Sequence, residues 1–152
     1  MVLCLLLARN ALLLNQYLAH LATRGTTVIW TDALDPLLAY LETVDASRLS
    51  IVDWGYSSSL CVLSSGRLPL QDISFSLQSP DENVDGIRSL MADTRNLFVE
   101  HAEGCDIFPQ ARERLASISQ RAGYVRHVQA VICDRNRRPR FEVVRYGTQS
   151  AP

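Results

Sequence analysis

Lysine is missing from this chain: all fifteen basic residues are arginine, and against sixteen acidic residues they give a net charge of −1. The arginine bias points first to genome composition and only weakly to a preference for bidentate contacts with carboxylates or phosphates. Because the totals hold no excess of positive charge, they give no sign of a partner with a phosphate backbone. We therefore expect no nucleic-acid partner.

Motifs for metals, nucleotides and acyl transfer are also missing. The four cysteines, Cys4, Cys61, Cys105 and Cys133, include no CxxC pair and no Cys/His pair at the spacing of metal ligands. Neither G-x-G-x-x-G nor the P-loop occurs, and there is no G-x-S-x-G elbow to hold a serine nucleophile. The sequence therefore predicts no metal site, no cofactor and no catalytic residue.

The chain also lacks an uninterrupted run of the roughly 20 apolar residues that a membrane-spanning helix needs. Its apolar start, residues 2–8, is broken by Arg9 and Asn10 and resumes only over 11–14. This is not a signal peptide, because no basic segment precedes the apolar run and no small-residue cleavage site follows it.

Two interpretations of residues 1–24 stay open. In the first, an amphipathic helix packs on the rest of the chain through its apolar side chains, namely Leu6, Leu13, Tyr17 and Leu21. In the second, the segment is the end of a membrane helix that begins outside this sequence.

What is present suits one domain. A chain of 152 residues, 47% of them apolar, can bury about 70% of the surface that it exposes when unfolded. We place the domain at residues 25–147, followed by a disordered tail at 148–152.

The clearest pattern lies in residues 48–70. Leu49–Val52 is short and rich in β-branched residues, which is typical of a buried strand, and Asp53-Trp54-Gly55 follows as a turn. From Tyr56 to Ser64 the apolar residues recur at helical spacing. The sequence thus predicts a strand, a tight turn and a helix.

The same patterns predict the other elements. Further strands are expected at 26–30, 69–76, 96–99, 125–133 and 140–146, and helices at 31–44, 84–92 and 109–122. The order strand, helix, strand over residues 26–52 predicts two parallel strands with a right-handed crossover, and the last two strands flank a turn at 134–139. We therefore predict a three-layer α/β fold: a mostly parallel sheet, helices on both faces, and a C-terminal antiparallel hairpin.

The carboxyl edge of this sheet is the predicted ligand site, because open α/β sheets bind ligands there. Acidic residues follow three predicted strands: Asp32, Asp53 and the segment 100–103, which includes His101. The candidate ligand-binding residues are Asp32, Asp53, Trp54, Tyr56 and His101. The competing interpretation is that the two aspartates serve as helix caps and turn formers.

Two further hypotheses concern chemistry at the surface. Asp53 and His101, with a serine from 57–59, have the residue types of a nucleophile triad, although the elbow motif is absent. The arginines of the turn at 134–139 are either solvated or bind an anion such as a lipid headgroup; the candidates are Arg135, Arg137 and Arg138.

Four segments, taken in order, resemble the soluble C-terminal region of bacterial lipid-carrier-dependent membrane glycosyltransferases, the protein-mannosyltransferase and aminoarabinose-transferase type. They are VIWTDALDPLLAYLE, RLSIVDWGYSSSLCVLSSGRL, LFVEHAEGCDIFPQAR and CDRNRRPRFEVVRY, and they span Val28 to Tyr146. The specificity of the resemblance lies in their order. The turn at Asn136-Arg137-Arg138 departs from the glycine expected in such a hairpin.

The resemblance implies a domain on the periplasmic, extracytoplasmic side of a membrane, with residues 1–14 as the tail of a membrane helix. Members of the family transfer a sugar from a polyprenyl phosphate, using acidic residues in a loop between membrane helices. No segment here corresponds to that loop, so no catalytic residue is transferred to this chain.

The implied function is therefore that of an accessory, non-catalytic domain. It would help to position the lipid-linked donor or its acceptor, and its partners would be the membrane helices of a glycosyltransferase or the lipid-linked sugar. The alternatives are a free-standing, cytoplasmic α/β protein that binds a small ligand or nucleotide and, least favoured, an esterase-like hydrolase.

Overall fold

The computed structural model describes residues 2–24, 31–79 and 83–148. The helices are α1 (Val2–Arg24), α2 (Leu34–Leu41), α3 (Ser57–Leu63), α4 (Val84–Ala92) and α5 (Pro109–Ala122). The strands are β1 (Arg48–Ile51), β2 (Leu70–Asp72), β3 (Asn96–His101), β4 (Tyr124–Cys133) and β5 (Pro139–Thr148). The predicted strand at 26–30 lies outside the described residues.

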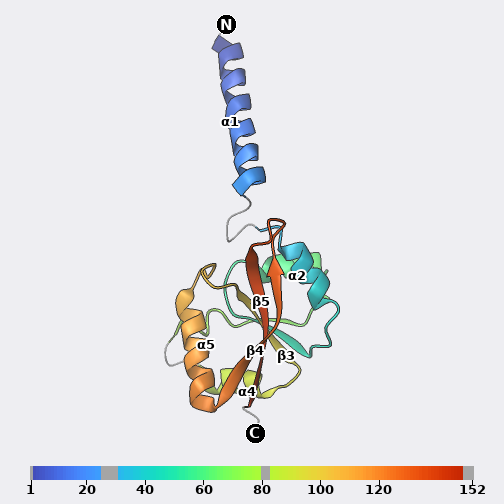
Figure 1. Ribbon diagram of the computed structural model, residues 1–152, viewed down its shortest axis with the longest axis vertical. Coiled ribbons are helices and arrows are strands. Elements are labelled where there is room, and N and C mark those ends of the chain that lie inside the picture. Colours follow the sequence, from blue (N-terminus) through green and yellow to red (C-terminus); the bar gives the residue numbers. More distant parts are fainter. Residues whose placement is uncertain (1, 25–30, 80–82, 149–152) are drawn as a thin grey trace.

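The described strands form one five-stranded sheet in the order β2-β1-β3-β5-β4 (Figure 1). β1 pairs in parallel with β2 and with β3, whereas β5 pairs antiparallel with both β3 and β4. The α/β class is therefore as predicted. The described sheet is mixed, because β5 lies between β3 and β4 and runs antiparallel to both.

The predicted strand, turn and helix at residues 48–64 are present. β1 ends at Ile51, and Gly55 then takes a φ of 107°, a backbone conformation open to glycine and strained for other residues. α3 begins two residues later, and the Tyr56 hydroxyl donates a hydrogen bond of 2.6 Å to the Val99 carbonyl of β3. The turn is thus tied to the neighbouring strand.

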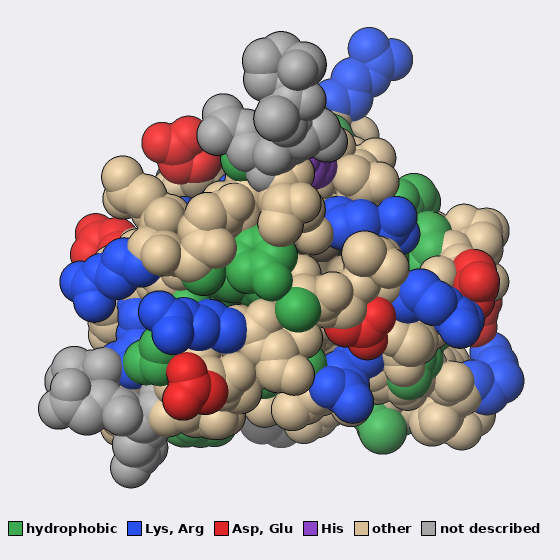
Figure 2. Space-filling view, turned by 90° about the horizontal axis from the view of Figure 1, so that it is seen from below, with side chains coloured by type: hydrophobic (Ala, Val, Ile, Leu, Met, Phe, Trp, Pro, Cys, Tyr) green, Lys and Arg blue, Asp and Glu red, His purple; other side chains and the backbone are tan. Residues whose placement is uncertain are grey.

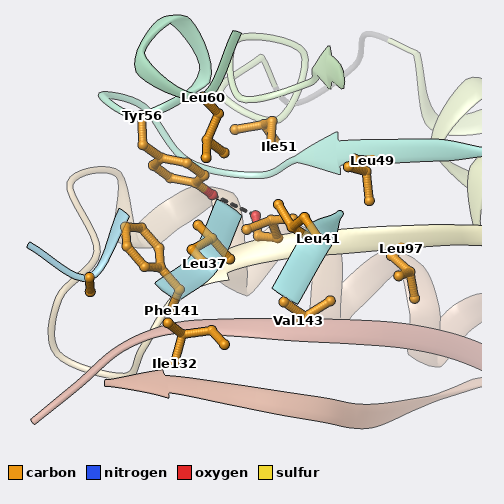
Figure 3. Close-up of a cluster of buried hydrophobic side chains, with 12 residues drawn as sticks. Leu37, Leu41, Leu49, Ile51, Tyr56, Leu60, Leu97, Ile132, Phe141 and Val143 are labelled. Carbon is orange, nitrogen blue, oxygen red and sulfur yellow. Dashed lines mark hydrogen bonds between the residues drawn. The ribbon is translucent and has the colours of Figure 1, made fainter. Parts of the chain in front are cut away.

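The buried apolar side chains of the sheet and helices form two hydrophobic clusters. Side chains alternate between the faces along β3, so Leu97 and Val99 join one hydrophobic cluster while Phe98 joins the other. The first cluster includes the buried side chains of α2 and α3, such as Leu37, and Figure 3 shows them directed at the strands. The second cluster includes those of α4 and α5, such as Ile87.

The two outer strands of the described sheet differ in length. β2 has three residues, whereas β4 has ten and lies at the opposite edge. The pairing of β4 with β5 skips Gln129, which makes a β-bulge between Val128 and Ala130.

α1 stands clear of the sheet and its helices in Figure 1. Leu6, Leu13 and Tyr17 are each more than half exposed, so they do not pack on the domain as the amphipathic interpretation expects. The side chain of Leu21, the fourth residue of that prediction, is outside the description. A search of the described residues finds no helix with the length and hydropathy to cross a membrane.

Truncating the first cluster should destabilise the fold. Leu37 is fully buried, so Leu37→Ala removes apolar contacts and leaves a cavity, which should lower the free energy of unfolding by about 2–5 kcal/mol. Urea denaturation followed by circular dichroism measures this. The matched control is Val62→Ala, at a side chain that is 77% exposed, where a change within about 0.5 kcal/mol is expected. Equal effects at the two positions would contradict the assignment of the core.

Candidate functional site

Asp53 and His101 meet at the carboxyl edge of β1 and β3. The parallel register pairs Ile51 with Val99, so the residues two positions further along each strand lie side by side. The Asp53 Oδ2 and His101 Nδ1 atoms are 2.7 Å apart, and both side chains are only 3% exposed. The predicted convergence of these two residues is therefore observed.

The Asp53 carboxylate also accepts three backbone hydrogen bonds. The N–H of Trp54 donates at 2.8 Å, and those of Ile107 and Phe108, just before α5, donate at 2.7 and 3.0 Å. Burial acts to raise the pKa of Asp53, but the hydrogen bonds from His101, Ile107 and Trp54 favour the charged form and leave the pKa lowered. An ionised Asp53 only accepts, so the His101 Nδ1–H donates to it.

Aromatic rings enclose His101. The Tyr56 ring meets the imidazole edge-on with centroids 4.9 Å apart, and the Phe141 ring stacks on it at 5.1 Å. Tyr56 is itself fully enclosed, and burial raises the pKa of its hydroxyl well above the ordinary value. This arrangement holds the pair rigidly and screens it from water.

The third member of a nucleophile triad is not in place at this pair. Within the part of the chain that the structure describes, no hydrogen bond joins His101 to a hydroxyl of Ser57, Ser58 or Ser59. Those serines form the start of α3, and Ser58 is exposed.

The side chains of the other two predicted ligand-binding residues, Asp32 and Trp54, have other surroundings. Asp32 forms an ion pair with Arg135, with its Oδ2 3.2 Å from the arginine Nε. Trp54 is 43% exposed and gives only its backbone N–H to Asp53. The structure thus brings Asp53, Tyr56 and His101 together, while Asp32 pairs with the β4–β5 turn.

Asp134 organises that turn. Its carboxylate accepts the backbone N–H groups of Asn136 and Arg138, and ion pairs to the side chains of Arg138 and Arg140 at 2.9 and 3.1 Å. Although burial acts to raise the pKa of Asp134, these hydrogen bonds lower it to about 2. Arg137 takes the left-handed conformation, with a φ of 61°, at the turn that lacks the expected glycine.

The three arginines proposed for anion binding therefore differ. Arg135 and Arg138 each pair with a carboxylate of the chain, Asp32 and Asp134 respectively. Among the described residues, no ion pair involves Arg137.

A second charged cluster lies on the other face of β3. Glu100 is buried, and its Oε2 accepts from Arg112 of α5 at 3.0 Å and from Arg126 of β4 at 2.9 Å. Arg126 also bonds Glu142, and Arg112 also bonds Asp106. Burial raises the pKa of Glu100, against the opposing effect of the two guanidinium groups.

Sequence reasoning grouped Glu100 with His101 and did not single out its two arginines. The period of two along a strand is the signal that separates Glu100 from His101, since consecutive residues face opposite sides of the sheet. No sequence pattern joins Arg112 to Arg126, because they come from different elements and meet only through tertiary packing.

Two of the cavities at the surface of the described residues are not lined by the Asp53–His101 pair. One of about 440 Å³ lies between α4 and α5, and one of about 340 Å³ lies beside α2 and β1. Neither is lined by Asp32, Asp53, Trp54, Tyr56 or His101. Among the described residues, no three His, Cys, Asp or Glu side chains gather as metal ligands would.

Protein-family models, curated proteins and solved structures were each compared with this chain, and none matches.

Removing the charge of Asp53 should destabilise the fold in a pH-dependent way. Asp53→Asn leaves a buried imidazole and backbone N–H groups poorly satisfied, so the free energy of unfolding should fall by about 3 kcal/mol at pH 7. Because the folded pKa of Asp53 is lowered, its contribution is present above the unfolded pKa of about 3.9 and is lost as the pH falls through the folded value.

Urea denaturation at pH 7 and in steps down to pH 3 tests this. The gap between wild type and variant should narrow below about pH 4. Asp45→Asn is the control, since Asp45 is exposed and pairs with Arg95 at the surface, where an effect below about 1 kcal/mol is expected. A gap that stays constant with pH would show that Asp53 does not act through its charge.

Proposed function

We propose that this chain is an accessory, non-catalytic domain of a lipid-carrier-dependent membrane glycosyltransferase, on the periplasmic side of the membrane. It helps to position the polyprenyl-phosphate sugar donor or the acceptor, and its partners are the lipid-linked sugar and the membrane helices of the enzyme. No nucleic-acid partner is assigned. The observation that supports this best is the leucine-rich helix α1, whose described side chains are exposed.

The exposed side chains of α1 surround the helix. Leu12 and Leu14 are 62% and 59% exposed, and two residues along a helix turn by about 200°, so they lie on opposite sides. A single partner helix covers one side only, whereas lipid or a bundle of helices covers both. α1 contains arginine but no acidic residue, which suits the anionic surface of a bilayer.

The arrangement at the end of the domain near α1 supports the same function. Figure 1 shows the turn between β4 and β5 at this end, and that turn contains Arg135, Arg137 and Arg138. The two carboxylates that could serve in catalysis at the sheet, Asp53 and Glu100, are both bound to partners within the chain. Because both carboxylates already bind side chains of the domain, a binding or positioning role is favoured over a catalytic one.

For the architecture we favour three layers with a C-terminal hairpin, as in the sequence prediction. The two hydrophobic clusters on opposite faces of the sheet support the layers. The antiparallel pairing of β4 with β5, two strands consecutive in the chain, supports the hairpin.

Vesicle flotation of the intact chain tests the function. We expect flotation with phosphatidylcholine vesicles that contain a polyprenyl phosphate, and weaker flotation when an equal fraction of phosphatidylglycerol replaces it. Replacing two exposed leucines of α1, in the variant L14Q/L18Q, should weaken binding by about tenfold or more, because less apolar surface leaves water.

Asn15→Gln on the same helix is the matched control and should float like the wild type. An intact chain that stays with the soluble fraction in both vesicle types would contradict the membrane partner. Equal flotation with the two anionic lipids would contradict recognition of the donor.

A further inference from the structure

The larger cavity is a groove along one face of α5. Its α5 residues recur at intervals of three and four positions, and α4 and the segment after β2 form the opposite wall. The lining residues are Leu77, Gln78, Val84, Arg88, Gln110, Glu113, Arg114, Ser117, Ile118 and Arg121. A volume of about 440 Å³ is that of a small-molecule site.

The floor of the groove is formed by apolar side chains of the hydrophobic core. Leu77 and Ile118 are 1% and 6% exposed, and both belong to the hydrophobic cluster that α4 and α5 form on the sheet. Val84, the first residue of α4, packs on the same cluster. An apolar ligand surface placed here would extend the existing core without moving it.

The rim of the groove is cationic. It has three arginines, Arg88, Arg114 and Arg121, and one acid among its lining residues, Glu113. Arg88 has an ion pair of 3.5 Å to Asp85, but both side chains are solvent-exposed, so this pair is weak. Ser117 and Gln110 add uncharged hydrogen-bonding groups.

Figure 2 looks at the end of the domain where α4 lies. It shows arginine side chains around hydrophobic ones on this face, with acidic side chains interspersed.

We propose that this groove binds a small organic phosphate, with the phosphate at the arginine rim and the apolar body on the floor of Leu77, Val84 and Ile118. Arg114 and Arg121 are two turns apart on one face of α5 and project from the same wall. Guanidinium groups bind phosphate through bidentate hydrogen bonds, and a phosphate monoester presents three acceptor oxygens.

This proposal does not depend on the proposed function. The groove has room for a small molecule with a short apolar part, but not for a polyprenyl chain. Either conclusion can therefore fail while the other stands. The groove is open to solvent, so we expect a dissociation constant on the order of a millimolar or somewhat below.

The test is an NMR titration of the intact, isotope-labelled chain with four probes. Phenyl phosphate has both parts of the predicted ligand, inorganic phosphate only the anion, benzyl alcohol only the apolar body, and benzyltrimethylammonium the opposite charge. Phenyl phosphate should shift the amide signals of α4 and α5 and bind about tenfold more tightly than inorganic phosphate or benzyl alcohol. The cation should not bind.

Variants at the exposed rim locate the site. R88Q/R121Q should weaken phenyl phosphate binding by about tenfold, while Arg121→Lys, which keeps the charge but loses the bidentate hydrogen bonds, should weaken it by a smaller factor. Arg67→Gln is the matched control, because Arg67 is an exposed arginine that lines the second cavity, and it should leave the affinity unchanged.

The proposal is overturned by any of three results. These are no binding of phenyl phosphate up to ten times the expected dissociation constant, equal binding of phenyl phosphate and benzyl alcohol, and equal loss of affinity in Arg67→Gln and R88Q/R121Q. The thermal unfolding midpoint of each variant shows whether it is folded, and a lower midpoint in R88Q/R121Q redirects the test to Arg121→Gln alone.

Discussion

The fold depends on the need to satisfy one buried carboxylate. Asp53 lies at the end of β1 with almost no access to water, where an unpaired charge would cost several kcal/mol. Four donors meet it: the imidazole of His101 and the backbone N–H groups of Trp54, Ile107 and Phe108. The carboxylate thereby fixes β1, β3 and the entry to α5 relative to one another.

The second charged cluster, around Glu100, also links neighbouring elements to β3, on the other face of that strand. Glu100 precedes His101 on β3 and so faces α5, where Arg112 and Arg126 link it to the helix and to the outermost strand. Two consecutive residues of β3 thus take part in different polar clusters, His101 with Asp53 at the end of β1 and Glu100 with Arg112 of α5 and Arg126 of β4. The opposite pKa shifts of Asp53 and Glu100 follow from their partners: hydrogen-bond donors outweigh burial at Asp53, and burial dominates at Glu100.

Local patterns predict most of the elements because the physical causes are local. Pro109 opens α5 where its missing N–H costs nothing, and Gly123 ends the helix with a φ of 74°. The strand, turn and helix around Asp53 follow in the same way from β-branched residues, a glycine and a change of period. The convergence of Asp53 and His101 at one sheet edge was also expected, because it requires only that two parallel strands end side by side; the hydrogen bond between them was not predicted.

The sequence does not predict which strands pair with one another or which charged side chains form ion pairs. Nothing in residues 139–148 specifies that β5 lies between β3 and β4, so the position of the antiparallel strand in the sheet was not predicted. Asp32 was predicted to converge with Asp53. Its carboxylate instead forms an ion pair with Arg135 of the β4–β5 turn, which is far from Asp32 in the sequence. Such contacts are properties of the assembled tertiary structure.

The bulge at Gln129 changes how the outer edge of the described sheet could pair with another strand. β4 is a ten-residue outer strand, and a flat strand of that length offers its unpaired N–H and C=O groups to any extended chain that approaches. The extra residue twists the edge and interrupts the regular spacing of those groups halfway along. A strand approaching β4 would therefore meet two short stretches of hydrogen-bonding groups that are out of register, which disfavours extension of the sheet at this edge.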